Sequence, residues 1–198
     1  GQSGGEPGRL PDGPPIAATD PELADLVATG DPLGDRMAVG LVGGDLARTV
    51  GATSSPDRLR SDQAHRLTID LGWVRADDGP ERPFVAHVIA RRSWWIGRVV
   101  AVCNAQYVGE WDVAPRSHPN DGRLDVLDGD PPVGDRWKAR RRLPSGTHVP
   151  HPDIGQRRVR RWDTTLERPT PVWVDGVRIG AARRLSVWIE PDAFTVVV

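Results

Sequence analysis

The sequence has few of the features that mark secreted, membrane-spanning or nucleic-acid-binding proteins. It contains one cysteine, Cys103, in 198 residues, which excludes an internal disulfide framework and favours a reducing compartment. No apolar run approaches the roughly 20 residues that cross a bilayer, and no signal peptide opens the chain. The net charge of −1 gives no global field that would attract nucleic acid. We therefore expect a cytoplasmic protein with no nucleic-acid partner.

Glycine and proline are abundant by contrast, with 22 and 19 residues, while hydrophobic residues make up 38%. This balance predicts a compact body with long connections. The length allows one domain, or one domain and part of a second. Residues 1–18 are rich in glycine and proline without any period, so we expect a flexible tail there.

Residues 19–61 predict a small α/β fragment. Asp20-Pro21 is a typical helix start, and Gly30 is a suitable helix end. The apolar stretch Met37–Val42 predicts a buried strand that runs into Gly43-Gly44-Asp45 and a second short helix. Backbone amides in such a turn can bind phosphate. The alternative is a plain turn in which Asp45 caps the helix.

From residue 62 to residue 198 the pattern changes to that of β-structure. Residues 66–74 alternate between apolar and polar side chains, and Phe84–Ala90 and Val99–Cys103 are apolar runs of strand length. Asp175-Gly176 between two apolar triplets predicts a hairpin. We expect further strands over residues 185–189 and 194–198 and a basic helix over 137–143. The predicted fold is mostly β, an antiparallel sandwich or barrel-like sheet with a small N-terminal α/β fragment.

Five segments, in order, resemble the diacylglycerol kinase and sphingosine kinase-like lipid kinases. They are LVGGDLARTVG over 41–51, VVAVCNAQYV over 99–108, APRSHPNDGRLDV over 114–126, Gly146-Thr147-His148, and Val174-Asp175-Gly176. The resemblance implies a C-terminal β-domain preceded by a remnant of the nucleotide domain, in a shortened, actinobacterial-type member. It further implies ATP and Mg²⁺ as cofactors, nucleotide contacts at Gly43, Gly44 and Asp45, and a magnesium site at Asp121 and Asp125. The alternative for the two carboxylates is a solvated surface turn.

The chain departs from the family pattern where catalysis is concerned. The family has a glutamate after Asp-Gly that is thought to act as general base, and this position holds Val177. The primary phosphate loop is missing, and the insertion thought to form the lipid pocket is short. We therefore assign no catalytic residue.

Two arginine clusters, Arg136–Arg142 and Arg157–Arg161, each adjoin a tryptophan. Arginine beside interfacial tryptophan is typical of surfaces that meet anionic membranes. Arg140, Arg141, Arg142 and Trp137 are the candidates for contact with a lipid or the inner membrane surface. The alternative is an ordinary solvated face.

Three functions fit the sequence. The first is a catalytically impaired lipid-kinase relative that binds a nucleotide, a lipid headgroup or a partner chain. The second is an active ATP- and Mg²⁺-dependent kinase that phosphorylates a diacylglycerol-type hydroxyl. The third is a non-enzymatic interaction domain whose sheet edge pairs with another protomer or partner chain.

Overall fold

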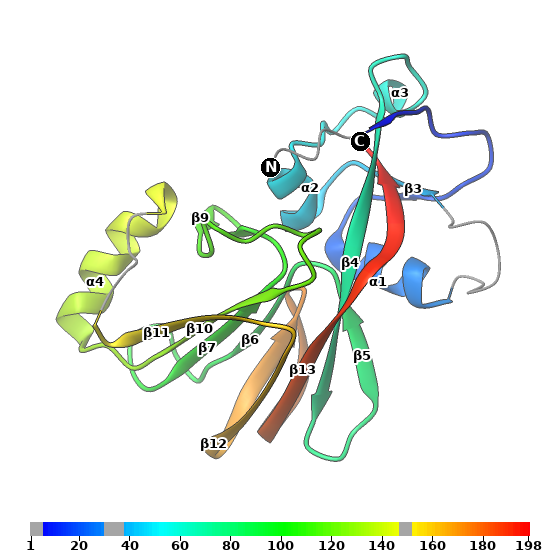
Figure 1. Ribbon diagram of the computed structural model, residues 1–198. Coiled ribbons are helices and arrows are strands. Elements are labelled where there is room, and N and C mark those ends of the chain that lie inside the picture. Colours follow the sequence, from blue (N-terminus) through cyan, green and yellow to red (C-terminus); the bar gives the residue numbers. More distant parts are fainter. Residues whose placement is uncertain (1–5, 30–37, 147–151) are drawn as a thin grey trace.

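The computed structural model describes residues 6–29, 38–146 and 152–198, and its main feature is one large curled β-sheet (Figure 1). The strands follow one another in the order β1-β4-β13-β12-β6-β7-β10-β11, with β5 paired to β4, and β2 and β3 attached through β13. Among the described residues only the β2–β3 and β3–β13 pairings are parallel. The predicted mostly-β, antiparallel sandwich fold is confirmed.

The strands vary widely in length. Their bounds are β1 (Glu6–Pro7), β2 (Ile16–Ala17), β3 (Ala38–Leu41), β4 (His65–Ala76), β5 (Glu81–Phe84), β6 (His87–Ala90), β7 (Val99–Cys103), β8 (Tyr107–Val108), β9 (Trp111–Asp112), β10 (Leu124–Gly129), β11 (Ile154–Val159), β12 (Arg161–Val174) and β13 (Val177–Val197). The short β8 and β9 form a separate hairpin.

Alternation along the strands divides the apolar side chains between the two faces of the sheet. Val88, Val100, Val102 and Val126 point into the curl, where they join Phe84 in the main core. The side chains of β6, β7 and β10 that point to the other side of the sheet form a second cluster on the outer face. Helix α4 (Val133–Arg142), continued by a short 3-10 helix (Leu143–Ser145), lies over that outer face (Figure 1).

The N-terminal part surrounds the parallel strand β3. Helices α1 (Asp20–Thr29), α2 (Gly44–Val50) and α3 (Pro56–Leu59) gather around it in Figure 1, and the α1 and α2 side chains share a core with the end of β13. Residues 6–18, expected as a tail, instead contain β1, which pairs with β4, and β2, which pairs with β3. The division of the chain at residue 61 stays a prediction.

Several expected elements differ in detail. The run Phe84–Ala90 is not one strand, because it breaks at Val85 and Ala86 between β5 and β6. The strands expected over 185–189 and 194–198 belong to the single strand β13, which shifts register between Glu190 and Phe194. The expected helix end at Gly30 and the Thr147-His148 motif lie outside the described residues.

Asp70 is the clearest exception to the alternating pattern of β4. Expected on the polar face, it is 1% exposed, and its carboxylate accepts hydrogen bonds from the amides of Gly122 and Asp192. Pairing with these donors stabilises a buried carboxylate.

None of the helices in the described ranges has the length and hydrophobicity that crossing a bilayer requires.

Candidate functional site

The Gly43-Gly44-Asp45 turn lies against the start of α1. The carboxylate of Asp20 accepts hydrogen bonds from the amides of Asp45 (2.6 Å) and Leu46 (3.1 Å). Only glycine fits at positions 43 and 44 beside this contact, because a Cβ atom at either position would be too close to a neighbouring oxygen. A Cβ on Gly44, whose φ is +96°, would lie 2.3 Å from an Asp20 oxygen, and one on Gly43 would lie 2.2 Å from the carbonyl oxygen of Ala18. A carboxylate of the chain therefore occupies the two amides that could otherwise bind phosphate.

The Asp45 side chain joins the N-terminal part to the β-domain. One carboxylate oxygen lies 2.9 Å from Nε2 of His87 on β6, and the other accepts a hydrogen bond from the Gly109 amide at 2.8 Å. Both oxygens thus have partners from the β-domain. The expected alternative, in which Asp45 caps its own helix, is not observed, because Asp20 is the cap. Nucleotide contacts at Gly43, Gly44 and Asp45 stay a prediction.

Asp175 fixes the β12–β13 hairpin to the break between β5 and β6. Its buried carboxylate accepts hydrogen bonds from the amides of Val85, Ala86 and His87 at 2.8, 2.9 and 2.8 Å. Its own amide donates to the His87 carbonyl at 2.9 Å. Asp175 has a φ of +46°, a region that aspartate tolerates better than most residues. The hairpin predicted from Asp-Gly is confirmed, and its aspartate works as a buried anchor.

Burial and charge together shift the titration of this junction. Burial raises the pKa of Asp20 to about 6. Burial lowers the pKa of His87, but the hydrogen bond to Asp45 and the charges of Asp175, Asp45 and Asp20 outweigh it and raise the pKa above its ordinary value. Burial also raises the pKa of Asp175, against the opposing charge of His87 and its three amide donors. Every shifted group at the junction therefore holds its proton more tightly in the folded state.

From the raised pKa values at this junction, we predict that the protein is more stable in mild acid than in mild base. A raised pKa of Asp20 removes stability as pH rises from about 3.8 to about 6. His87 contributes stability that is fully present below its ordinary pKa of 6.5 and is lost as pH rises through the higher folded value. Urea unfolding between pH 5 and pH 8.5 measures both effects. His87→Gln, which keeps a donor for Asp45, should flatten the slope above pH 6, whereas the same change at exposed His65 should leave it unchanged.

The two carboxylates predicted to hold magnesium lie close together and share a partner. Arg158 on β11 forms a salt bridge with Asp121, and its Nε lies 3.5 Å from Oδ1 of Asp125. The second oxygen of Asp125 is buried without a hydrogen-bond partner. Across the described part of the chain no group of three or more His, Cys, Asp or Glu side chains is placed to hold a metal ion. Magnesium at Asp121 and Asp125 stays a prediction, and the carboxylates have a cationic partner without it.

The position that holds the general base in the lipid kinases that the sequence resembles lies at the start of β13. Val177 is 52% exposed there and offers no group that accepts a proton. Glu190, the only glutamate on β13, accepts a hydrogen bond from the Trp73 indole at 3.0 Å.

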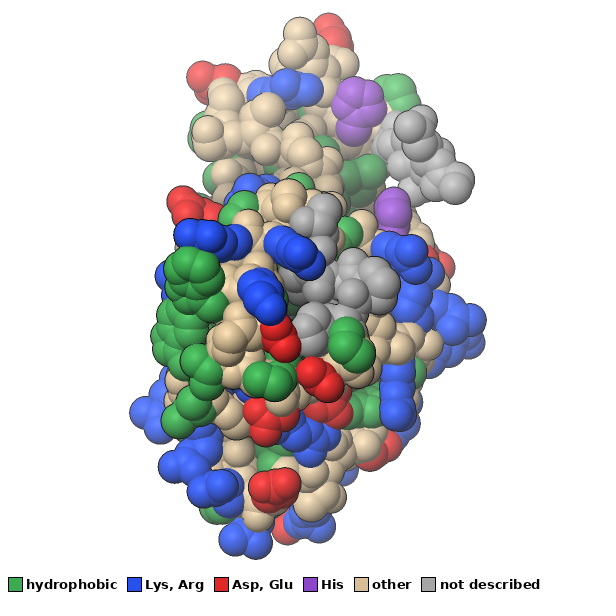
Figure 2. Space-filling model, turned by 90° about the vertical axis from the view of Figure 1, so that its left-hand side faces the viewer, with side chains coloured by type: hydrophobic (Ala, Val, Ile, Leu, Met, Phe, Trp, Pro, Cys, Tyr) green, Lys and Arg blue, Asp and Glu red, His purple; other side chains and the backbone are tan. Residues whose placement is uncertain are grey.

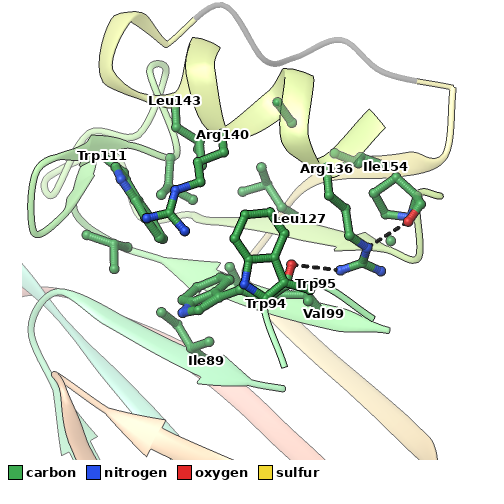
Figure 3. A pocket seen from close by; sticks show the side chains of 16 residues that line it. Ile89, Trp94, Trp95, Val99, Trp111, Leu127, Arg136, Arg140, Leu143 and Ile154 are labelled. Carbon is green, nitrogen blue, oxygen red and sulfur yellow. Dashed lines mark hydrogen bonds between the residues drawn. The ribbon is translucent and has the colours of Figure 1, made fainter. Parts of the chain in front are cut away.

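A second candidate site is an apolar pocket between α4 and the outer face of the sheet. It encloses about 130 Å³. Figure 3 shows Ile89, Val99 and Leu127 of the sheet on one side and Leu143 and Arg140 on the helical side. Three tryptophans, Trp94, Trp95 and Trp111, are also part of the lining. Trp94 and Trp111 pack edge to face at 5.2 Å.

Arg136 holds α4 in place over this pocket. It is 7% exposed, and its guanidinium donates to the carbonyl oxygens of Pro131 (2.7 Å), Gly97 (2.5 Å) and Trp94 (3.3 Å). A further bond reaches Asp130 at 2.6 Å. These four hydrogen bonds join the helix to residues 94–97 and 130–131, which makes Arg136 a structural residue at the edge of the pocket.

The remaining arginines of the helix are exposed. The Arg140 guanidinium lies 5.1 Å from the Trp95 ring centre and 5.5 Å from that of Trp111. Arg141 stacks on Trp137 at 3.8 Å. The structure thus brings Arg140, Arg141, Arg142 and Trp137 onto one helix, with Arg140 lining the pocket.

Sequence reasoning missed three residues of these sites. Asp20 carries a recognisable capping signal, but its partners belong to α2, 25 and 26 residues away. His87 lies inside an apolar run that the sequence marks only as a strand. Arg136 belongs to a cluster whose other members are exposed, and only packing distinguishes it.

A curled antiparallel sandwich joined to a small α/β fragment defines the class of this protein, a β-sandwich domain. The chain belongs to the family of the YegS C-terminal NAD kinase beta sandwich-like domain, whose model matches residues 80–198. No curated protein matches the chain.

Solved structures show the same fold at low identity. Two from Bacillus anthracis strain Sterne are described as a "putative diacylglycerol kinase", with TM-scores of 0.69 and 0.68 at 13% and 14% identity. A third from the same strain, described as a diacylglycerol kinase, has a TM-score of 0.62 at 14% identity. Each alignment covers 91% of this chain, and it covers 76%, 76% and 74% of the respective structures. The chain is diacylglycerol kinase-like in fold.

Proposed function

We propose that this protein is a catalytically impaired member of the diacylglycerol kinase-like family that binds the apolar part of a lipid beneath α4. The observation that carries the proposal is the pocket itself. Its lining is almost entirely aliphatic or aromatic, with arginines at its edge. Ligand sites are commonly apolar clefts with a few polar groups that fix orientation.

The pocket suits one segment of an acyl chain. A dry cavity of roughly 150 Å³ can hold a benzene-sized group, and this pocket, which is open towards the surface, has a volume of about 130 Å³. Burial of each methylene there contributes about 0.8 kcal/mol. Arg140, whose guanidinium lies beside Trp95 and Trp111, is placed to pair with a carboxylate or phosphate at the other end of the ligand.

Impaired catalysis rests on two features of the junction. Phosphoryl transfer needs charge neutralisation around the phosphates and a group that takes or orients the proton of the nucleophile. The Asp20 carboxylate at the Asp45 and Leu46 amides places negative charge where phosphate would bind. Val177 stands where the family has its carboxylate. Both features disfavour transfer from ATP·Mg²⁺.

Titration with cis-parinaric acid, a fluorescent fatty acid, tests lipid binding. We expect saturable binding by the unmodified protein and at least about tenfold weaker binding by Ala139→Trp, because the larger side chain on α4 would fill the pocket. Ala181→Trp places the same side chain on the exposed part of β13 and should bind the probe normally. Equal binding by all three proteins would contradict the proposal.

The catalytic half of the proposal is tested separately. We expect no saturable binding of ATP·Mg²⁺ and no transfer of phosphate to diacylglycerol in mixed micelles. Phosphate transfer that disappears in Asp45→Ala would overturn the impaired assignment and favour the active kinase.

A further inference from the structure

Exposed hydrophobic side chains gather at one place on this protein. Among the described residues, five large hydrophobic side chains are exposed, and four of them belong to two adjoining segments. Trp95 and Ile96 lie in the loop before β7, and Val133 and Trp137 lie on α4. Their exposed fractions are 39%, 63%, 56% and 51%. Large hydrophobic side chains clustered on a surface mark an interaction site.

The same two segments concentrate positive charge. Residues 91–98 and 130–142 contain eight arginines or lysines and two aspartates, whereas the whole chain has a net charge of −1. We call the following residues, all exposed except the half-buried Arg91, the tryptophan–arginine surface: Arg91, Arg92, Trp95, Ile96, Val133, Trp137, Arg140, Arg141 and Arg142. Figure 2 shows hydrophobic side chains along one margin of this side of the molecule, with Lys and Arg side chains next to them.

Internal contacts hold the tryptophan–arginine surface in shape before any partner arrives. Arg136 ties the 94–97 loop to α4 through carbonyls at both segments (Figure 3). Arg141 stacks on Trp137, and Arg91 lies 4.2 Å from the Trp94 ring centre. A preorganised surface loses little side-chain entropy on binding.

We propose that the tryptophan–arginine surface docks the protein onto the headgroup region of an anionic lipid bilayer. Tryptophan is favoured at the membrane–water interface, and each arginine near an anionic leaflet adds electrostatic attraction. Val133, Trp137 and Arg141 are spaced four residues apart and therefore share one face of α4. That face can lie in the plane of the interface.

Charge distinguishes a bilayer from a second copy of the chain. A two-fold dimer would place the same surface against itself, so an excess of arginines would meet an equal excess. An anionic bilayer supplies the complementary charge. Docking does not require a filled pocket, so this inference goes beyond the proposed lipid binding, although Trp95 and Arg140 belong to both sites.

Co-sedimentation with sucrose-loaded vesicles tests the inference. We expect binding to phosphatidylcholine vesicles that contain phosphatidylglycerol, weaker binding as salt rises, and little binding to phosphatidylcholine alone. Arg141→Gln with Arg142→Gln should lower the partition coefficient about tenfold or more. Ile96→Ser with Trp137→Ala should lower it similarly, because two of the four exposed hydrophobic side chains of the surface are removed.

Matched controls lie on the β12–β13 hairpin. Arg178→Gln with Arg183→Gln removes two exposed arginines, and Val177→Ser removes an exposed hydrophobic side chain, both outside the tryptophan–arginine surface. These controls should bind vesicles normally. Equal losses in the controls and the surface variants would overturn the inference.

Two further outcomes separate docking from its alternatives. Ala139→Trp should still sediment with vesicles, and the docking variants should still bind cis-parinaric acid. Loss of vesicle binding in Ala139→Trp would assign the membrane contact to the pocket and overturn the docking surface. The other outcome is a dimer, seen by sedimentation velocity, that Trp137→Ala dissociates, together with no binding to vesicles. That result would assign the surface to a second copy of the chain and would also overturn the membrane inference.

Discussion

Asp175→Ala is expected to lower the free energy of unfolding by roughly 3 kcal/mol, because three buried amides lose a charged acceptor. The amides of Val85, Ala86 and His87 lie at the β5–β6 break, where strand pairing does not satisfy them. A shift of the urea midpoint at unchanged slope would show that stability, and not the unfolded state, has changed.

Asp192→Ala is the matched control for this change. Asp192 also has a positive φ, +51°, and lies on β13, which follows the Asp175 turn, but its side chain is exposed. Both variants place alanine in the left-handed region, so the difference between them isolates the carboxylate. Equal destabilisation by the two variants would show that backbone strain, rather than the buried anchor, explains the loss.

Arg136→Ala should have the second large effect, on both stability and the pocket. The variant leaves the carbonyl oxygens of Pro131, Gly97 and Trp94 without their donor, which costs about 2 to 4 kcal/mol. Because Arg136 joins α4 to the 94–97 loop, we expect faster amide hydrogen exchange in both segments. Binding of cis-parinaric acid should weaken by about tenfold or more, since the helix that covers the pocket is released.

The exposed Arg141 provides the comparison on the same helix. Arg141→Ala removes an arginine whose guanidinium stacks on Trp137 and takes no part in joining α4 to the loop. It should leave hydrogen exchange of residues 94–97 and binding of the fatty acid unchanged. Parallel effects in the two variants would indicate that the total charge of α4 matters and that the buried contacts of Arg136 do not.

Local patterns in the sequence predicted the β-domain well, for physical reasons. Val99–Cys103 and the hairpin around Asp175-Gly176 form as expected, because strand periodicity and a turn that favours positive φ are encoded within a few residues. The basic helix expected over residues 137–143 is also observed, as α4, which begins earlier, at Val133.

Contacts between distant segments could not be read from the sequence in the same way. Asp20 lies beside the expected phosphate turn only because α1 packs against α2. Phe84–Ala90 has the composition of one strand, but the carboxylate of Asp175, about ninety residues away, draws its amides out of the ladder. The same limit applies to Arg136, whose burial depends on a loop almost forty residues earlier.

The parallel pairing of β3 with the end of β13 governs when the protein can fold during synthesis. Ala38–Gly40 pair with Thr195–Val197, so more than 150 residues separate partners within one ladder. Such non-local pairing slows folding, and β3 has no neighbour on its β13 side until residues 195–197 are available to pair. We therefore infer that the β5–β11 region can acquire structure during translation, whereas the N-terminal part completes its fold only once β13 has been synthesised.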